Sequence, residues 1–230
     1  MLGLLRHAEY AQPPGVPSAH LPYALTPRGR QQATAAATAI ADFAQSRGIA
    51  LESVIDCSPL RRAWETAHLL GLGLEASTGQ GFACREFAEL AERSLGALAN
   101  LSVESIEAIV RDDPRFASPP PNWKRDSDYR LPLLGCESLS EAGARVARHL
   151  KSCARALEHP NRLKLVVGHG GALRHAAEQL GVLSRARVSE LSMDHCVAIY
   201  LDCPSRSGAS EHFVHVAGQW RQRSTSSPPD

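Results

Sequence analysis

The residues Met1-Leu2-Gly3-Leu4-Leu5-Arg6-His7-Ala8-Glu9 form an apolar run that ends abruptly at charged and polar side chains. A short apolar run bounded in this way is typical of a buried β-strand. It is too short for a signal sequence or a membrane span. We therefore expect a strand over residues 2–5 that begins the fold and presents Arg6 and His7 at its carboxyl end.

Helix and strand signals alternate through the next part of the chain. Thr26-Pro27 combines an N-cap residue with a first-turn proline, which predicts a helix over residues 28–47. Val54 to Cys57 indicates a second strand. Ser58-Pro59 is expected to start another helix that runs to about Leu70, where Gly71 and Gly73 should end it.

The second half continues this alternation. We expect a helix over residues 103–112, a loop over 114–132, a helix over 138–157 that starts with a Ser138/Glu141 capping box, and a strand over 163–167. Gly168-His169-Gly170-Gly171 then turns into a helix over residues 172–180, and residues 196–202 and 212–216 are predicted strands. This order predicts a three-layer α/β/α sandwich around a mostly parallel sheet, which binds ligands beyond the carboxyl ends of its strands.

Length and composition restrict the remaining possibilities. The 230 residues are expected to form a single domain over 1–222, with a lid or specificity insertion around 100–135 and a disordered tail over 223–230. A net charge of +1 predicts no general attraction to nucleic acid or membranes. The six cysteines are scattered without metal-ligand spacing, which indicates reduced thiols in a cytoplasmic protein.

Chemically suggestive side chains follow four of these predicted element boundaries. Arg6 and His7 follow the first strand, an Arg61-Arg62 pair lies in the first turn of a helix, Glu92 lies in a loop, and His169 lies between glycines. Each alone has an ordinary explanation, such as a solvated helix face or a tight turn. Together they describe an anion-binding site.

The ordered set of motifs resembles the histidine phosphatase superfamily, the phosphoglycerate mutase-like group. The matching stretches are Leu4-Leu5-Arg6-His7-Ala8-Glu9, Leu25-Thr26-Pro27-Arg28-Gly29-Arg30-Gln31-Gln32-Ala33, Ser58-Pro59-Leu60-Arg61-Arg62-Ala63-Trp64-Glu65-Thr66-Ala67, Glu92-Arg93-Ser94-Leu95-Gly96, Glu137-Ser138-Leu139 and Val167-Gly168-His169-Gly170-Gly171. They extend over most of the chain, and their order is far more specific than any one of them.

This resemblance implies a phosphatase in which His7 attacks phosphorus and carries the phosphoryl group. It implies that Arg6, Arg62 and His169 hold the phosphoryl oxygens and that Glu92 donates the proton. Arg62 is preferred to Arg61, and Glu92 to Glu89, because of the family spacing. Further candidates for substrate binding are Arg61, Glu9, Arg93 and Gly170.

These residue types suit phosphoryl transfer. Arginine offers planar, paired donors to phosphate oxygens. For attack, His7 must present a neutral ring nitrogen while its other nitrogen is held by an acceptor such as a backbone carbonyl. The scheme needs no metal and no cofactor, and a small phosphorylated substrate is the expected partner. A homodimer is left open.

Three alternatives are retained. A cofactor-dependent mutase is suggested by Glu92-Arg93 and by Asn122-Trp123-Lys124-Arg125-Asp126, whereas Leu95 and Gly171 depart from the mutase pattern. Ala8 and Pro13 replace a glycine and an asparagine that are usual in the family, which bears on substrate binding more than on the nucleophile. The second is a non-catalytic module that binds a phosphorylated ligand on the same fold. The third is a metallohydrolase that uses His7 and His169 as ligands. In the insertion, Lys124, Arg125 and Arg130 are further cations that could meet an anionic substrate.

Overall fold

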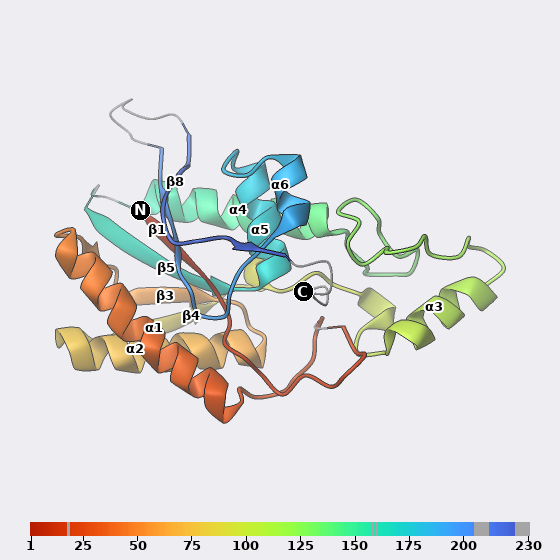
Figure 1. The fold of residues 1–230 in the computed structure, drawn as a ribbon, viewed down its shortest axis with the longest axis horizontal. Coiled ribbons are helices and arrows are strands. Elements are labelled where there is room, and N and C mark those ends of the chain that lie inside the picture. Colours follow the sequence, from red (N-terminus) through yellow and green to blue (C-terminus); the bar gives the residue numbers. More distant parts are fainter. Residues whose placement is uncertain (18, 158, 160, 205–211, 224–230) are drawn as a thin grey trace.

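The computed structural model describes residues 1–17, 19–157, 159, 161–204 and 212–223 (Figure 1). Its first part contains β1 (Leu2–Arg6), α1 (Pro27–Ser46), β2 (Ala50–Leu51), β3 (Val54–Cys57), α2 (Arg61–Thr78), β4 (Ala83–Glu86), the 3-10 helices η1 (Ala88–Leu90) and η2 (Gly96–Leu98), and α3 (Val103–Asp112). Then follow α4 (Leu139–Ala156), β5 (Arg162–Gly168), α5 (Gly170–Gln179), α6 (Arg185–Glu190), β6 (Leu191–Ser192), β7 (Ile199–Asp202), β8 (Val214–Ala217) and β9 (Arg221–Gln222).

The main sheet has the strand order β4-β3-β5-β1-β7-β8, and β2 also pairs with β5. The pairs β4/β3, β3/β5 and β5/β1 are parallel, whereas β7 runs antiparallel to both β1 and β8. Arg6 lies opposite Gly168, and Cys57 lies opposite Val167. The register therefore brings the carboxyl ends of β1, β3 and β5 to one edge of the sheet, as the sequence predicts.

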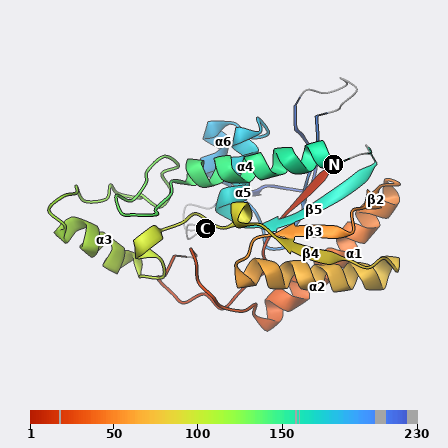
Figure 2. The ribbon, with the colours of Figure 1, turned by 180° about the vertical axis from the view of Figure 1, so that it is seen from behind.

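Helices cover both faces of the sheet, which confirms the predicted α/β/α layers. Helices α1 and α2 lie on one face, and α4 and α5 lie on the other (Figures 1 and 2). Alternate residues of β1 contribute to the two cores: Leu5 packs on the α1/α2 side, whereas Leu2 and Leu4 pack on the α4/α5 side. A strand buried on both faces needs the continuous apolar run that begins the sequence.

Helix α2 corrects the prediction that Gly71 and Gly73 end it. The helix continues to Thr78 and ends at Gly79, which has a left-handed φ of 71°. A Cβ on Gly73 would lie 2.6 Å from the Cβ of Ala37 in α1. Gly73 therefore permits close packing of two helices, a role that the sequence alone does not distinguish from helix termination.

Several short elements were not predicted. Strand β4 lies at the sheet edge with mostly exposed side chains, so it lacks the apolar alternation that marks a strand. Strand β7 was predicted over residues 196–202 and ends there, but it begins at Ile199 rather than at Cys196, whose positive φ of 60° interrupts the extended chain. At the other end, the backbone N–H of Arg223 donates to the carbonyl of Glu190, whereas 224–230, the rest of the predicted tail, lies outside the described residues.

Residues 93–137 form a projecting segment beyond the carboxyl edge of the sheet, and they include α3 (Figures 1 and 2). Residues 114–132 contain no helix or strand, as predicted. The segment has its own apolar cluster around Ile106, Val110 and the buried Trp123. No helix within the described part of the chain is long and apolar enough to cross a membrane.

Candidate active site

Three strand ends bring the predicted phosphate-binding residues together. His7 follows β1, Arg62 lies in the first turn of α2 after β3, and His169 is the N-cap of α5 after β5. The Nε of Arg62 lies 3.2 Å from Nε2 of His7, and its Nη2 lies 3.2 Å from Nδ1 of His169. All three side chains are buried. One guanidinium therefore contacts both imidazoles.

Arg62 also determines which tautomer each histidine adopts. A guanidinium can only donate hydrogen bonds, so Nε2 of His7 must be an acceptor. Nδ1 of His7 then carries the proton and donates to the carbonyl of Ala8, at 2.8 Å. By the same argument Nδ1 of His169 accepts, and its Nε2 donates to Oγ of Ser58 at 2.8 Å. His7 thus has the neutral form with a lone pair on Nε2 that nucleophilic attack requires.

Backbone carbonyls fix Arg62 in this position. Its Nη1 donates to the carbonyl of Leu21 at 3.2 Å, and its Nη2 donates to the carbonyl of Ala19 at 2.9 Å. The guanidinium also lies 4.8 Å from the ring centre of Tyr10, a cation–π contact. The loop between β1 and α1 therefore orients a cation that α2 supplies.

Burial and positive charge keep both histidines neutral. Burial, followed by the charges of Arg62 and of His169, lowers the pKa of His7 well below 6.5. Burial, followed by the charges of Arg62 and Arg6, lowers the pKa of His169 in the same direction. Arg6 is held by the carbonyl of Met193, which accepts from its Nη1 at 3.1 Å. The cluster is therefore electropositive and suited to an anion.

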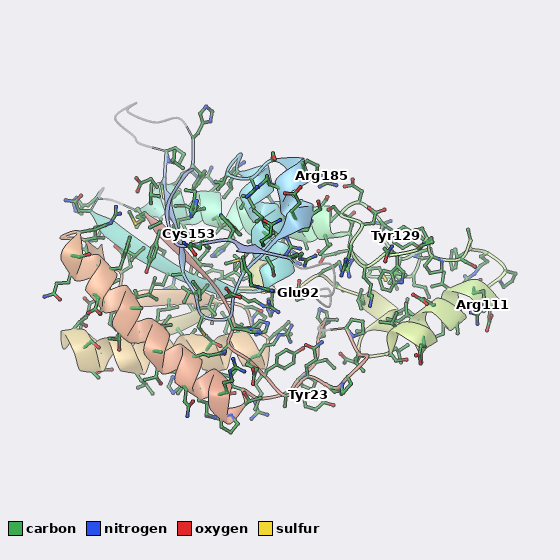
Figure 3. The ribbon with its side chains drawn as sticks, viewed as in Figure 1. Tyr23, Glu92, Arg111, Tyr129, Cys153 and Arg185 are labelled. Carbon is green, nitrogen blue, oxygen red and sulfur yellow. The ribbon has the colours of Figure 1, made fainter. Side chains whose placement is uncertain are left out.

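Glu92 lies beside this cluster, as the sequence predicts. Its side chain is buried, and its Oε2 lies 4.0 Å from Nδ1 of His169. Figure 3 places Glu92 between the sheet and the projecting segment that carries Arg111 and Tyr129. Glu89, the alternative proton donor, is exposed.

Arg145 of α4 holds the loop that carries Glu92, a role that the sequence motifs did not indicate. Its guanidinium donates to the carbonyls of Glu89 at 2.7 Å, Ala91 at 3.1 Å and Glu92 at 3.4 Å. It also forms a two-point ion pair with Glu137, with N–O distances of 2.7 and 3.0 Å. Arg145 is therefore a positioning residue for the candidate proton donor.

The other candidates for substrate binding lie in different surroundings. Arg61 is exposed, so the structure favours the choice of Arg62. The carboxylate of Glu9 accepts from Thr26 Oγ1 at 2.8 Å and lies 3.7 Å from Arg28, at the start of α1. Gly170 is the first residue of α5. The substrate-binding roles of Arg61, Glu9 and Gly170 stay predictions.

Two further side chains at the cluster, those of His195 and Tyr10, were not predicted from the sequence motifs. The ring of His195 lies 5.4 Å from the ring of His7, and its Nδ1 donates to the carbonyl of His7 at 2.6 Å. The ring of Tyr10 lies edge-on to His7 at 5.4 Å. Both arrive through loops whose paths follow from tertiary packing, so no motif signalled them.

Glu92 also lines a small pocket. Its wall includes Glu92 itself and four cationic side chains, from Arg93, Lys124, Arg174 and Arg223. Arg93 and Lys124 come from the projecting segment, Arg174 from α5, and Arg223 from the end of the described chain. Of the other predicted cations of the insertion, Arg130 pairs with Glu141 at 3.3 Å.

One group of side chains in the described part of the chain is compact enough to hold a metal ion: Asp56, His149 and Cys153. It does not include His7 or His169, so the metallohydrolase alternative gains no third ligand from it. Lys164 Nζ lies 2.5 Å from Oδ1 of Asp56, and His149 Nε2 lies 2.9 Å from Oδ2. The group is thus already an ion-paired network.

Several solved structures are similar to this chain over most of its length. A mycobacterial hydrolase structure is 25% identical, covers 96% of this chain and 88% of its own, and has a TM-score of 0.65. Mycobacterial glucosyl-3-phosphoglycerate phosphatase is 24% identical, with 96% of each chain covered and a TM-score of 0.64. The α-ribazole phosphatase of Shigella flexneri is 20% identical, with 94% of this chain and 95% of its own covered and a TM-score of 0.68.

At this identity these likenesses show the fold. No curated protein matched the sequence significantly. The family profile described as histidine phosphatase superfamily (branch 1) matches residues 2–214, which include every residue of the His7, Arg62, Glu92 and His169 cluster. The chain therefore belongs to branch 1 of the histidine phosphatase superfamily.

Proposed function

We propose that this protein hydrolyses a phosphate monoester through a phosphohistidine on His7. The observation that carries the proposal is the buried His7 ring, whose Nδ1 donates to Ala8 while its Nε2 lone pair faces Arg62. Family membership and the named activities of structural neighbours, which are phosphatases, support hydrolysis.

In the first step Nε2 of His7 forms a bond to phosphorus, and the bond between phosphorus and the substrate's alcohol oxygen breaks. Arg62, Arg6 and His169 hold the phosphoryl oxygens, whose charge they stabilise in the transition state. Protonated Glu92 gives its proton to the departing oxygen, which leaves as a neutral alcohol.

In the second step water attacks phosphorus, and the Glu92 carboxylate takes a proton from it. The bond between nitrogen and phosphorus breaks, phosphate leaves, and both His7 and Glu92 return to their starting forms. Both steps use side chains of this chain alone. We therefore also propose that turnover needs no metal ion, so that activity should survive a chelator. The cytoplasmic location and the homodimer stay predictions.

Substitution of the nucleophile tests the proposal. We expect His7→Ala to lower kcat for p-nitrophenyl phosphate at least 10³-fold, because no nearby group replaces the nucleophile; this corresponds to about 4 kcal/mol of transition-state stabilisation. The measurement is steady-state kinetics on protein whose fold is verified by circular dichroism. His68→Ala, an exposed histidine on α2, is the matched control.

Trapping the intermediate gives independent evidence. Rapid acid-free quenching with labelled substrate should place an acid-labile phosphate on wild-type His7 and none on His7→Ala. Substantial turnover by His7→Ala at unchanged substrate affinity would overturn the assignment. Isomerisation of phosphoglycerate that depends on added bisphosphoglycerate would instead favour the mutase alternative.

A further inference from the structure

At the carboxyl end of β1, the Arg6-His7 pair extends beyond the part of β1 that pairs with β7. On the β5 side the chain is still paired, because the backbone N–H of His7 donates to the carbonyl of Gly168 at 2.9 Å. On the β7 side, the antiparallel ladder covers Leu2 to Leu4. The carbonyls of Arg6 and His7 therefore take their donors from outside β7, because an unpaired buried carbonyl is costly.

The segment that precedes β7 supplies these donors. The backbone N–H of Cys196 donates to the carbonyl of Arg6 at 3.0 Å, and Nδ1 of His195 donates to the carbonyl of His7 at 2.6 Å. The same segment accepts from Nη1 of Arg6 through the carbonyl of Met193. Two consecutive carbonyls of the candidate catalytic pair are thus held by two consecutive residues.

The backbone of Cys196 is strained where it makes this contact. Its φ of 60° is left-handed, a conformation that is unfavourable for a residue with a Cβ. Strain of this kind persists where the surrounding contacts over-determine it, and it is concentrated at functional sites. The conformation therefore favours a role of this segment in the site over an incidental contact.

His195 also contacts the ring of His7. The centres of the two rings lie 5.4 Å apart, with an angle of 50° between the ring planes. The rings of His169 and Tyr10 lie 5.1 and 5.4 Å from the same ring. Three rings therefore surround the imidazole of His7, and one of them, His195, is also bonded to the backbone of that residue.

The proposed reaction depends on the exact position of His7. Its Nε2 must lie about 3–3.5 Å from phosphorus and in line with the leaving oxygen, and a displacement of about 1 Å can cost about 10²-fold in rate. Other side chains, Arg6, Arg62 and His169, are proposed to bind the phosphoryl oxygens. A residue that positions His7 alone should therefore affect bond formation more than phosphate binding.

We propose that His195 is a positioning residue for the nucleophile, whose hydrogen bond from Nδ1 to the carbonyl of His7 keeps Nε2 of His7 aligned with phosphorus. This inference rests on the proposed phosphohistidine mechanism. The bonding atom predicts which replacement works. The amide nitrogen of asparagine is two bonds from Cβ, as Nδ1 is, whereas that of glutamine is three bonds from Cβ, as Nε2 is.

Three variants test the hydrogen bond. We expect His195→Ala to lower kcat/KM for p-nitrophenyl phosphate about 10- to 100-fold, because His7 loses its alignment. His195→Asn should recover activity to within about fivefold of the wild-type protein, whereas His195→Gln should stay close to His195→Ala. Glutamine fills more space than asparagine, so this order separates a hydrogen bond at one atom from simple packing.

Two inhibitors separate alignment from general damage to the site. Inorganic phosphate needs the groups that bind phosphoryl oxygens. Orthovanadate gains affinity by taking Nε2 of His7 as a fifth ligand, in a geometry that resembles the transition state. We expect His195→Ala to raise the inhibition constant of orthovanadate at least about tenfold and that of phosphate less than about threefold.

His215→Ala is the matched control. Nε2 of His215 also donates to backbone carbonyls, in the turn after β8. His215 pairs with Leu201, which pairs with Leu2 at the opposite end of β1 from Arg6. This variant therefore removes a histidine–carbonyl contact from the same β7/β8 hairpin, far from the nucleophile. It should leave kcat/KM and both inhibition constants near the wild-type values.

Two results would overturn the inference. One is equal activity of His195→Asn and His195→Gln, a comparison that also decides the matter where His195→Ala does not fold. The other is an equal rise of both inhibition constants in His195→Ala. Failure of the proposed function has a different signature, because the wild-type protein would then neither turn over p-nitrophenyl phosphate nor form a phosphohistidine.

Discussion

At the scale of single residues, the proposed reaction depends on which group protonates the leaving oxygen. We expect Glu92→Gln to lower kcat/KM for an alkyl phosphate about 10²- to 10⁴-fold, because an alkoxide leaves poorly without a proton. For p-nitrophenyl phosphate the loss should be about tenfold or less, since the phenolate leaves readily. Steady-state kinetics with both substrates measures the difference.

The exposed Glu89 provides the control, because Glu89→Gln makes the same carboxylate-to-amide replacement at a nearby position. It should leave both reactions near the wild-type rate. Equal losses for the two substrates in Glu92→Gln would count against Glu92 as the acid, and a selective loss in Glu89→Gln would transfer the role to Glu89.

Many residues of the candidate site could be predicted at this scale, because they follow predicted strands or begin predicted helices in the sequence. The choice of Arg62 over Arg61 agrees with their burial, since only Arg62 faces the two histidines. The carbonyls of Ala19 and Leu21 that orient Arg62 could not be predicted. Every residue has a carbonyl, so its position follows only from the path of the loop.

At the scale of elements, His175 joins α5 to the projecting segment. Its Nδ1 lies 2.8 Å from the carbonyl of Gly171, and its Nε2 lies 3.0 Å from Oγ of Ser127. Burial, followed by the charge of Arg174, lowers the pKa of His175 to about 4. The folded protein therefore keeps this imidazole neutral in a pH range where an unfolded chain protonates it.

The sign of the resulting pH dependence follows from proton binding. Below pH 6.5 the unfolded chain binds a proton at this position that the folded chain does not, so stability falls as the pH falls toward 4. The full effect of His175 is about 3 kcal/mol. In His175→Gln the free energy of unfolding should vary less between pH 6.5 and 4.5, as measured by urea denaturation.

His68→Gln serves as the comparison, because His68 is exposed on α2. Its pH dependence should match that of the wild-type protein. An unchanged slope in His175→Gln would show that the imidazole is protonated in the folded state as well.

Element boundaries were the least predictable part of the fold. Gly71 and Gly73 look like helix-ending residues in the sequence, yet α2 passes through both. Whether a glycine ends a helix or admits a neighbouring helix depends on what lies beside it, here Ala37 of α1. Such information is tertiary, whereas the capping box of Ser138 and Glu141 is local and was predicted correctly.

At the scale of the whole molecule, Asp56 connects the sheet to the α4 layer. Its carboxylate receives Lys164 from β5 at 2.5 Å and His149 from α4 at 2.9 Å. Burial acts to raise the pKa of Asp56, but the hydrogen bonds from His149 and Lys164 together lower it. We expect Asp56→Asn to lower the free energy of unfolding by about 3–5 kcal/mol, because it leaves the Lys164 charge poorly compensated.

Chemical denaturation of matched variants measures this effect. The double variant Asp56→Asn/Lys164→Met removes both charges and should recover much of the loss. Asp113→Asn, which breaks the exposed pair with Arg115, should leave the unfolding midpoint unchanged. A double variant as unstable as Asp56→Asn alone would show that packing, rather than charge, explains the loss.

The architecture as a whole was the most predictable level. Alternating strand and helix signals, with a fully apolar run at residues 2–5 and a mostly apolar run at 163–167 that Lys164 interrupts, allow few arrangements other than a parallel sheet between helix layers. The parallel register of β1 and β5 then places His7 and His169 at the same edge. The path of residues 93–137 could not be predicted in this way, because irregular segments lack periodicity.

Arg145 holds both ends of that segment, through the carbonyls of residues 89–92 on one side and Glu137 on the other. The backbone N–H of Glu137 also donates to the carbonyl of Ser94. The hydrogen bonds of Arg145 and of Glu137 therefore hold the two ends of the segment together, and they do not involve the residues between those ends. Evolution or protein engineering can therefore exchange the segment between these two points for one of another length while Glu92, the proposed proton donor, stays in place.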